Sequence, residues 1–180
     1  VSNLSYIVLA ACLMTQNGLI AALAHMLFHA LIKITLFFCA GAVLVKTERT
    51  QIEDLRGMAK VMPFTCATYT IGAISLMGTP LLPGFVSKWL IGSAAIETGT
   101  TLGMIGVAAI LISAVLTAIY LMGPALSMYF RPLEGMEPTA KCDPGMRMKL
   151  PFAILAVSIV LCGVFSNQII TLLTTLAAGV

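Results

Sequence analysis

Three ionisable side chains, His25, His29 and Lys33, follow one another at intervals of four residues within an apolar stretch. Four residues advance an α-helix by slightly more than one turn, so these side chains form a stripe along one face of a helix. Histidine titrates near neutral pH, and an amine removed from water is readily deprotonated because burial disfavours its charged form. The stripe therefore predicts a path along which protons, or another ion, move.

The helix that carries this stripe is predicted to cross a membrane. Its apolar stretch runs from Leu19 to Val45, and these 27 residues can span a bilayer with some tilt. A lysine near the middle of such a helix costs roughly 2.5–3.5 kcal/mol on insertion scales, so Lys33 must face protein or water. As alternatives, each histidine only caps a helix or bonds a carbonyl, or Lys33 snorkels to a helix end; no helix end is close to Lys33.

The composition is that of a polytopic membrane protein. Of the 180 residues, 59% are hydrophobic and 9% are charged, against roughly 25% charged in soluble domains. Most of the ten basic residues are split between short loops and form no patch, which speaks against a nucleic-acid partner. Five scattered cysteines form no C-x-x-C pair and no cluster with histidine, so no metal site and no cofactor are expected. They are Cys12, Cys39, Cys66, Cys142 and Cys162.

A second lysine lies beside a predicted helix break. The apolar stretches 62–76 and 85–96 are each short for a span, and two glycines and two prolines separate them: Gly78, Pro80, Pro83 and Gly84. One helix broken near the middle of the membrane fits this pattern, because unwound backbone is tolerated there where it is buried in protein or lines a wet cavity. The alternative is a tight hairpin between two short spans.

Lys88 follows this break by one turn, within the membrane. A charge that moves on Lys88 would be felt by its neighbours in the low dielectric, which suits an ion path. The alternative is a structural role in which Lys88 bonds the free carbonyls of the break. Hydroxyls are a weaker signal, because they are common in membrane helices; those able to hold water here are Thr35, Ser75, Thr79 and Ser87.

The distribution of charge favours the broken helix over the hairpin. If the break lies within one span, the polar loops 46–60 and 131–149 are on one side and hold eight of the ten basic residues. The turns at 16–18 and 97–101 are then on the other side and hold none. By the positive-inside rule, loops 46–60 and 131–149 are cytoplasmic. Only Lys33 and Lys88 remain, both inside the membrane.

The remaining segments complete an all-α transmembrane bundle of about five spans, with residues 1–180 as a single domain. The first segment covers 4–14 and ends at the turn-like sequence 16–18. A long segment covers 102–130 with an expected kink at Gly123-Pro124, and the last span covers 150–173. Because Val1 lies almost within a hydrophobic segment and no signal peptide is evident, we expect a fragment or the second half of a split gene.

Several motifs together resemble the antiporter-like membrane subunits. The motifs are the His25–Gly41 pattern His-x3-His-Ala-x2-Lys-x3-Phe-x2-Ala-Gly, then Asp54-Leu55-Arg56-Gly57-Met58, Met62-Pro63, and the run from Gly78 to Trp89. This family includes the large membrane subunits of respiratory complex I, the D-type component of Mrp sodium/proton antiporters, and related hydrogenase subunits. The sequence of residues 33–42 most resembles that of the D-type subunits of the Mrp antiporters.

The resemblance implies two inverted five-helix repeats, of which this chain would be the second with the C-terminal helices. It places His25, His29 and Lys33 on the central hydrophilic axis and Lys88 on the second broken helix. The implied function is translocation of protons, or exchange of sodium for protons, without redox chemistry in this chain. Expected partners are other membrane subunits of a Mrp-, complex I- or hydrogenase-type assembly in a prokaryotic plasma membrane. A non-transporting scaffold subunit and a stand-alone secondary transporter are the alternatives.

Overall fold

The computed structural model describes residues 2–133 and 142–177, and this part of the chain is helical without strands. The elements are α1 (Ser2–Cys12), α2 (Gln16–Thr47), the 3-10 turns η1 (Ile52–Leu55) and η2 (Met58–Lys60), α3 (Pro63–Met77), α4 (Pro83–Glu97), α5 (Thr101–Phe130), α6 (Met146–Val164) and α7 (Ser166–Ala177). Three of these helices, α2, α5 and α6, are each long and apolar enough to cross a membrane. The predicted all-α membrane bundle is confirmed.

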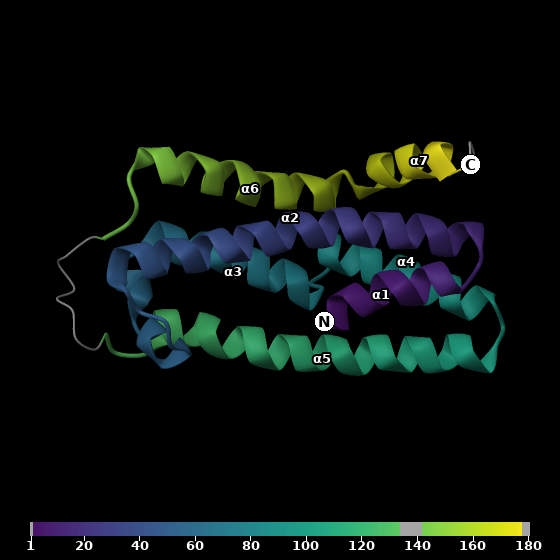
Figure 1. The fold of residues 1–180 in the computed structure, drawn as a ribbon, viewed down its shortest axis with the longest axis horizontal. Helices are drawn as coiled ribbons and strands as arrows, with labels where there is room; N and C mark the ends of the chain where they lie inside the picture. Colours follow the sequence, from purple (N-terminus) through teal and green to yellow (C-terminus); the bar gives the residue numbers. More distant parts are fainter. Residues whose placement is uncertain (1, 134–141, 178–180) are drawn as a thin grey trace.

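Helix α2 is the central element of the bundle. It contacts α1, α3, α4, α6 and α7, and in Figure 1 it lies between the α6–α7 layer and the α3–α4 layer. Beside the middle of α2, apolar side chains from several helices form one core cluster, which includes Ile32, Leu36, Leu76 and Ile159. The predicted stripe of histidines and lysine is therefore carried by a helix that packs against five others.

Helices α3 and α4 follow one another end to end and together run the length of the bundle (Figure 1). Each has 15 residues, about 22 Å at 1.5 Å per residue, so neither spans a membrane core of about 30 Å alone. Helix α5 then runs back along both of them and packs against each. The broken helix is confirmed, and the hairpin between two short spans is wrong.

Helix α2 begins earlier than the sequence suggests. Residues 16–18 are its first turn rather than the turn before it, because the hydroxyl of Thr15 accepts a hydrogen bond from the Gly18 N–H at 3.0 Å and caps the helix. At the other end α2 continues to Thr47. The following loop is not wholly solvated, since Met58, Val61 and Met62 are fully buried.

The last predicted span is divided in two. Helix α6 ends at Val164, and α7 starts at Ser166 after an irregular residue, Phe165. The N–H of Phe165 still bonds the Leu161 carbonyl at 2.8 Å, so the helix closes there before the chain turns into α7. Around this point the sequence has neither proline nor paired glycines, which is why it predicts one continuous span.

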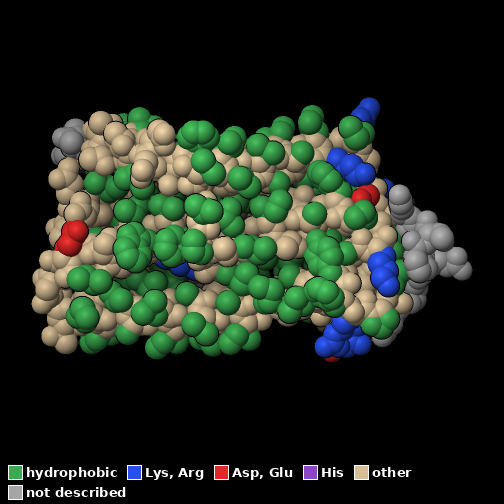
Figure 2. Space-filling view, turned by 180° about the vertical axis from the view of Figure 1, so that it is seen from behind, with side chains coloured by type: hydrophobic (Ala, Val, Ile, Leu, Met, Phe, Trp, Pro, Cys, Tyr) green, Lys and Arg blue, Asp and Glu red, His purple; other side chains and the backbone are tan. Residues whose placement is uncertain are grey.

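Charged side chains gather at one end of the bundle, as Figure 2 shows. Helices α2 and α5 end here, helices α3 and α6 begin here, and the turns η1 and η2 lie between α2 and α3 (Figure 1). The predicted placement of loops 46–60 and 131–149 on one side is therefore confirmed for their described residues; Lys141 lies outside these. At the opposite end Asn17 donates a hydrogen bond to Glu97 at 2.7 Å, joining the start of α2 to the end of α4.

Candidate functional site

The break between α3 and α4 is built by the residues that predicted it. Gly78 has φ +101° and closes α3 in the left-handed conformation, which glycine adopts without strain. Pro83 is the first residue of α4, where its missing N–H costs nothing. A side chain at Gly84 would collide with the Ser75 carbonyl oxygen, so only glycine lets α4 start this close to the end of α3. Pro80 is exposed.

The last four carbonyls of α3, those of residues 74–77, all have partners although the helix ends inside the bundle. The Thr79 N–H and hydroxyl donate to Ile74 at 3.3 and 3.1 Å, and the Gly78 N–H donates to Ser75 at 3.1 Å. The remaining two carbonyls, of Leu76 and Met77, accept from the Lys88 ammonium at 2.8 and 2.9 Å. Lys88 thus reaches back across the break and caps α3.

The position of Lys88 combines burial with favourable electrostatics. Its side chain is 8% exposed, and its positive charge faces the carbonyl end of α3, where the helix dipole is negative. The ammonium has three protons, of which the two carbonyls use two. The third proton can leave without breaking either bond. Lys88 also lines a cavity of about 420 Å³ between α4 and α5, together with Trp89.

His25 is held from both sides by hydrogen bonds to other helices. Its Nε2 lies 3.0 Å from the Asn3 carbonyl oxygen on α1, and its Nδ1 lies 2.9 Å from the Ser87 Oγ on α4. A carbonyl only accepts, so Nε2 carries a proton and donates to Asn3. The Tyr6 ring meets the imidazole edge to face, with 5.5 Å between the ring centroids. The side chain of His25 is buried.

The stripe turns from the interior towards the surface of the described chain. Steps of four residues drift by about 40° around a helix, so His25 is buried whereas His29 and Lys33 are half-buried. The rings of His25 and His29 stack with 5.8 Å between centroids. Within the described residues, His29 Nδ1 has no hydrogen-bond partner, and Lys33 Nζ lies 5.8 Å from the centroid of the Phe37 ring.

The structure thus joins the histidine stripe to the broken helix through Ser87, the neighbour of Lys88. The sequence indicates this hydroxyl only as a weak candidate for holding water. Sequence reasoning missed its counterpart Asn3 altogether, because a backbone carbonyl leaves no signal in the residue type. The other candidate hydroxyls play local roles: Thr35 donates to the Leu31 carbonyl at 2.8 Å, and the buried Ser75 Oγ lacks a hydrogen-bond partner among the described residues.

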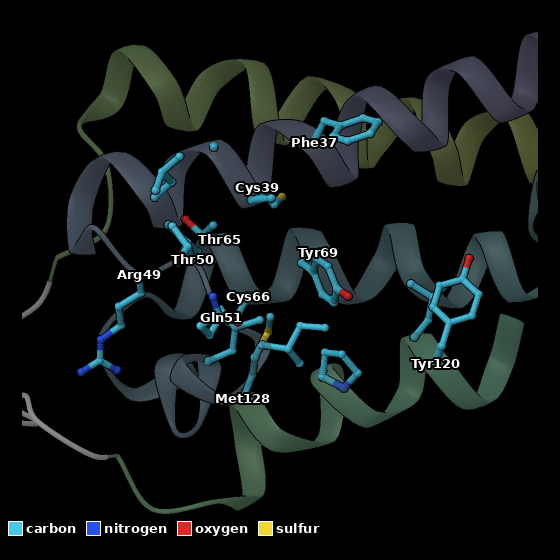
Figure 3. A pocket seen from close by; sticks show the side chains of 18 residues that line it. Phe37, Cys39, Arg49, Thr50, Gln51, Thr65, Cys66, Tyr69, Tyr120 and Met128 are labelled. Atoms are coloured by element: carbon cyan, nitrogen blue, oxygen red, sulfur yellow. The ribbon is translucent and has the colours of Figure 1, made fainter. Parts of the chain in front are cut away.

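A second cavity, of about 620 Å³, lies between α2, α3 and α5 towards the basic end (Figure 3). Its walls are mainly apolar, with Cys39, Cys66 and Tyr69 inside and Arg49 near its end. Neither the two histidines nor the two membrane lysines line it. Among the described residues no group of three or more histidine, cysteine or acidic side chains is placed to bind a metal ion.

Comparisons with known proteins agree with this architecture. Residues 1–117 match the family described as "NADH:quinone oxidoreductase/Mrp antiporter, TM". NADH-quinone oxidoreductase subunit N of Desulforudis audaxviator is 34% identical over 182 residues, which cover 95% of this chain and 36% of the relative. A chain of the Mrp complex from Dietzia sp. DQ12-45-1b has the same fold, with a TM-score of 0.84 at 21% identity over 96% of this chain and 40% of that one.

A chain of the archaeal membrane-bound sulfane sulfur reductase is also similar, with a TM-score of 0.79 and 32% identity over 91% of this chain and 32% of that one. The chain therefore spans 32–40% of the length of these relatives. The family match covers well over half of the chain, and the resemblance inferred from the motifs is confirmed. This chain belongs to the NADH:quinone oxidoreductase/Mrp antiporter family of transmembrane proteins.

Proposed function

We propose that this chain forms the second repeat of an antiporter-like subunit that translocates protons, or exchanges sodium for protons, through His25, His29, Lys33 and Lys88. The observation that carries the proposal is the hydrogen bond of 2.9 Å between His25 and Ser87. It brings the titratable stripe of α2 to the residue next to Lys88 on the broken helix. Two ionisable systems that are 63 positions apart in the sequence (His25 to Lys88) are thereby adjacent at the middle of the bundle.

The donor geometry of Lys88 supports a role in carrying a proton. Because two of its three ammonium protons bond the Leu76 and Met77 carbonyls, the neutral amine can keep both bonds. Gain and loss of the third proton therefore leave the break paired. A lysine that only had to bond carbonyls would work equally well with a permanent charge.

The half-buried positions of His29 and Lys33 support further protein beside α2. An intramembrane lysine faces protein or water, so the surface next to Lys33 is not a lipid-facing one. This chain covers only 36% of the length of the subunit N relative and 40% of the Mrp chain, so more than half of each relative has no counterpart in it. We infer that the first repeat of the same subunit covers this surface and that other membrane subunits of a Mrp-, complex I- or hydrogenase-type assembly adjoin it. Loops 46–60 and 131–149 face the cytoplasm in this proposal.

The test compares three variants of Lys88 in the full-length subunit within its assembly. Transport is followed in membrane vesicles with a pH-sensitive dye at matched expression. Lys88→Met is expected to lose most transport, because it removes the titratable group. Lys88→Glu is expected to keep more transport, because a buried carboxyl group, like a buried amine, can take up and release a proton near the working pH.

Lys88→Arg separates transport from scaffolding. Arginine can donate to both carbonyls but cannot release a proton in a protein, so it should assemble and still fail to transport. The scaffold function, which the two carbonyl bonds of Lys88 favour, predicts instead that Lys88→Arg behaves as the wild type. Transport by Lys88→Arg or Lys88→Met at the wild-type rate would exclude the proton-carrier role.

A further inference from the structure

We propose that Ser87 is a positioning residue whose hydroxyl turns between two acceptors and so keeps Nδ1 of His25 hydrogen-bonded in both the neutral and the charged form of the ring. This inference rests on the proposed function, because it assigns how one of the proposed groups is served by its surroundings. The Ser87 Oγ lies 2.9 Å from His25 Nδ1 and 3.4 Å from the carbonyl oxygen of Gly84. Its single hydroxyl proton can be directed to either acceptor.

The neutral form of His25 fixes one orientation. Because Nε2 donates to the Asn3 carbonyl, the lone pair of the neutral imidazole is on Nδ1. Ser87 then donates its hydroxyl proton to Nδ1. Every polar atom of the buried ring is paired, as burial requires.

Protonation of His25 reverses the bond without leaving a group unpaired. The arriving proton binds Nδ1, whose N–H now donates to the Ser87 oxygen, while Nε2–H stays on Asn3. The Ser87 hydroxyl keeps its own proton and turns it towards the Gly84 carbonyl, in the first turn of α4. The departing proton leaves from Nδ1 and the hydroxyl turns back. No covalent bond of Ser87 is broken in either direction.

The groups around His25 make such compensation necessary. His29 stacks on its ring from the same helix, Tyr6 faces it from α1, and Lys88 follows Ser87 on α4. None of these neighbours is an anion that could stabilise an imidazolium ion. The acceptor oxygen of Ser87 and the carbonyl of Asn3 are thus what the structure offers to the charged form.

The pH dependence of transport tests this role. Ser87→Ala removes the acceptor of the charged form and the donor of the neutral form, and the hydrogen bond to the charged form is the stronger one. His25 in the variant therefore takes up its proton only at lower pH. We expect the alkaline limb of the transport profile to move down by about 0.5–1 pH unit, which is about three- to tenfold less transport at a fixed pH on that limb. Acidification should restore part of the loss.

Ser93 provides a matched control on the same helix. Its hydroxyl donates to the Leu90 carbonyl at 3.0 Å, and no hydrogen bond joins it to either histidine among the described residues, so Ser93→Ala should leave the profile in place. Ser87→Cys keeps the size of the side chain but accepts hydrogen bonds weakly, and should give a smaller shift in the same direction. This variant serves as the test if Ser87→Ala does not assemble.

The two proposals fail in different ways. A profile of Ser87→Ala, or of Ser87→Cys where it stands in, that coincides with that of Ser93→Ala would overturn the role of Ser87. If Lys88→Met is inactive in the same vesicles, the proposed function still stands. If Lys88→Met transports at the wild-type rate, the proposed path through Lys88 is excluded, whatever the profile of Ser87→Ala shows.

Discussion

The ammonium of Lys88 donates to the carbonyl oxygen of Leu76 at 2.8 Å, across the gap between two halves of one membrane helix. The same ammonium donates to Met77 at 2.9 Å. The residue proposed to carry charge is therefore also the residue that completes the end of α3. Variants of Lys88 must be assessed for stability as well as for transport.

Lys88→Met is expected to lower the stability of the fold. It leaves one buried and one partly buried carbonyl without a donor, at a cost of about 1–3 kcal/mol for the buried carbonyl and less for the other. Lys88→Arg retains donors and should recover most of this loss. The stability of each variant is measured by heating the purified assembly and recording the temperature at which half of the subunit is released. Equal midpoints for Lys88→Met and the wild type would show that the two bonds contribute nothing to stability.

Gly84→Ala should disturb the break itself. The added methyl group meets the Ser75 carbonyl oxygen, which belongs to the backbone and cannot turn aside, so overpacking should cost about 1–3 kcal/mol. Gly92→Ala in the same helix is the control, because nothing lies within 4 Å of the added atom. Helix propensity favours that change by up to about 1 kcal/mol. A Gly84→Ala variant as stable as Gly92→Ala would contradict the close approach of the two half-helices.

Asp143 is expected to stabilise the start of the broken helix from a distant loop. Its carboxylate accepts from the Phe64 N–H at 3.1 Å and from the N–H and hydroxyl of Thr65 at 3.3 and 3.1 Å. Asp143→Ala removes this cap and should cost about 0.5–2 kcal/mol in unfolding free energy. Asp143→Asn keeps an acceptor oxygen and should lose less. If Asp143→Asn lost more stability than Asp143→Ala, the cap would not act through these hydrogen bonds.

His29→Ala and Lys33→Ala in the full-length subunit are expected to reduce ion translocation while the subunit still assembles. Neither change leaves a buried charge without its partner, so the fold should survive. Met26→Ala, at an exposed position of the same helix, is the control and should transport normally. The dye assay in vesicles measures the rates. A Lys33→Ala variant that pumps at the control rate would remove Lys33 from the path.

Single cysteines should locate the two ends of the bundle relative to the membrane. In a cysteine-free background, cysteines at Thr50 and Arg147 are expected to react with an impermeant reagent only from the cytoplasm, and one at Gln16 only from outside. All three positions are exposed. Reaction of Thr50→Cys from outside would reverse the proposed orientation, although the fold would stand.

Local chemistry made much of this fold predictable. Two glycines and two prolines between short apolar stretches predicted the break, because their backbone effects do not depend on the rest of the protein. Four-residue spacing likewise placed His25, His29 and Lys33 on one helix. The sequence predicts a turn at Gln16-Asn17-Gly18, because these residue types favour turns. In the structure the hydrogen bond from the Gly18 N–H to the Thr15 hydroxyl caps α2, so the helix starts at Gln16. The division at Phe165 has no comparable residue signal.

The contacts of the candidate site could not be predicted in the same way. The bond between His25 and Ser87 depends on how α2 and α4 are placed against each other, which spacing within one helix does not specify. The carbonyls of Asn3 and Leu76 take part through backbone atoms that every residue has. Residue types and spacing thus identify the ionisable groups, whereas their partners required the packed structure.

Gly163 on α6 lies so close to the break that a side chain there would collide with the Leu81 carbonyl oxygen. Helix α6 carries no charged residue beyond its first turn, yet its position is tied to the unwound segment between the two half-helices. The sequence freedom of this last long helix is therefore limited by the broken helix, although α6 carries none of the residues proposed to move ions. In a selection for restored growth, second-site changes that rescue a bulkier residue at 163 should map to residues 81–83 rather than to the titratable groups.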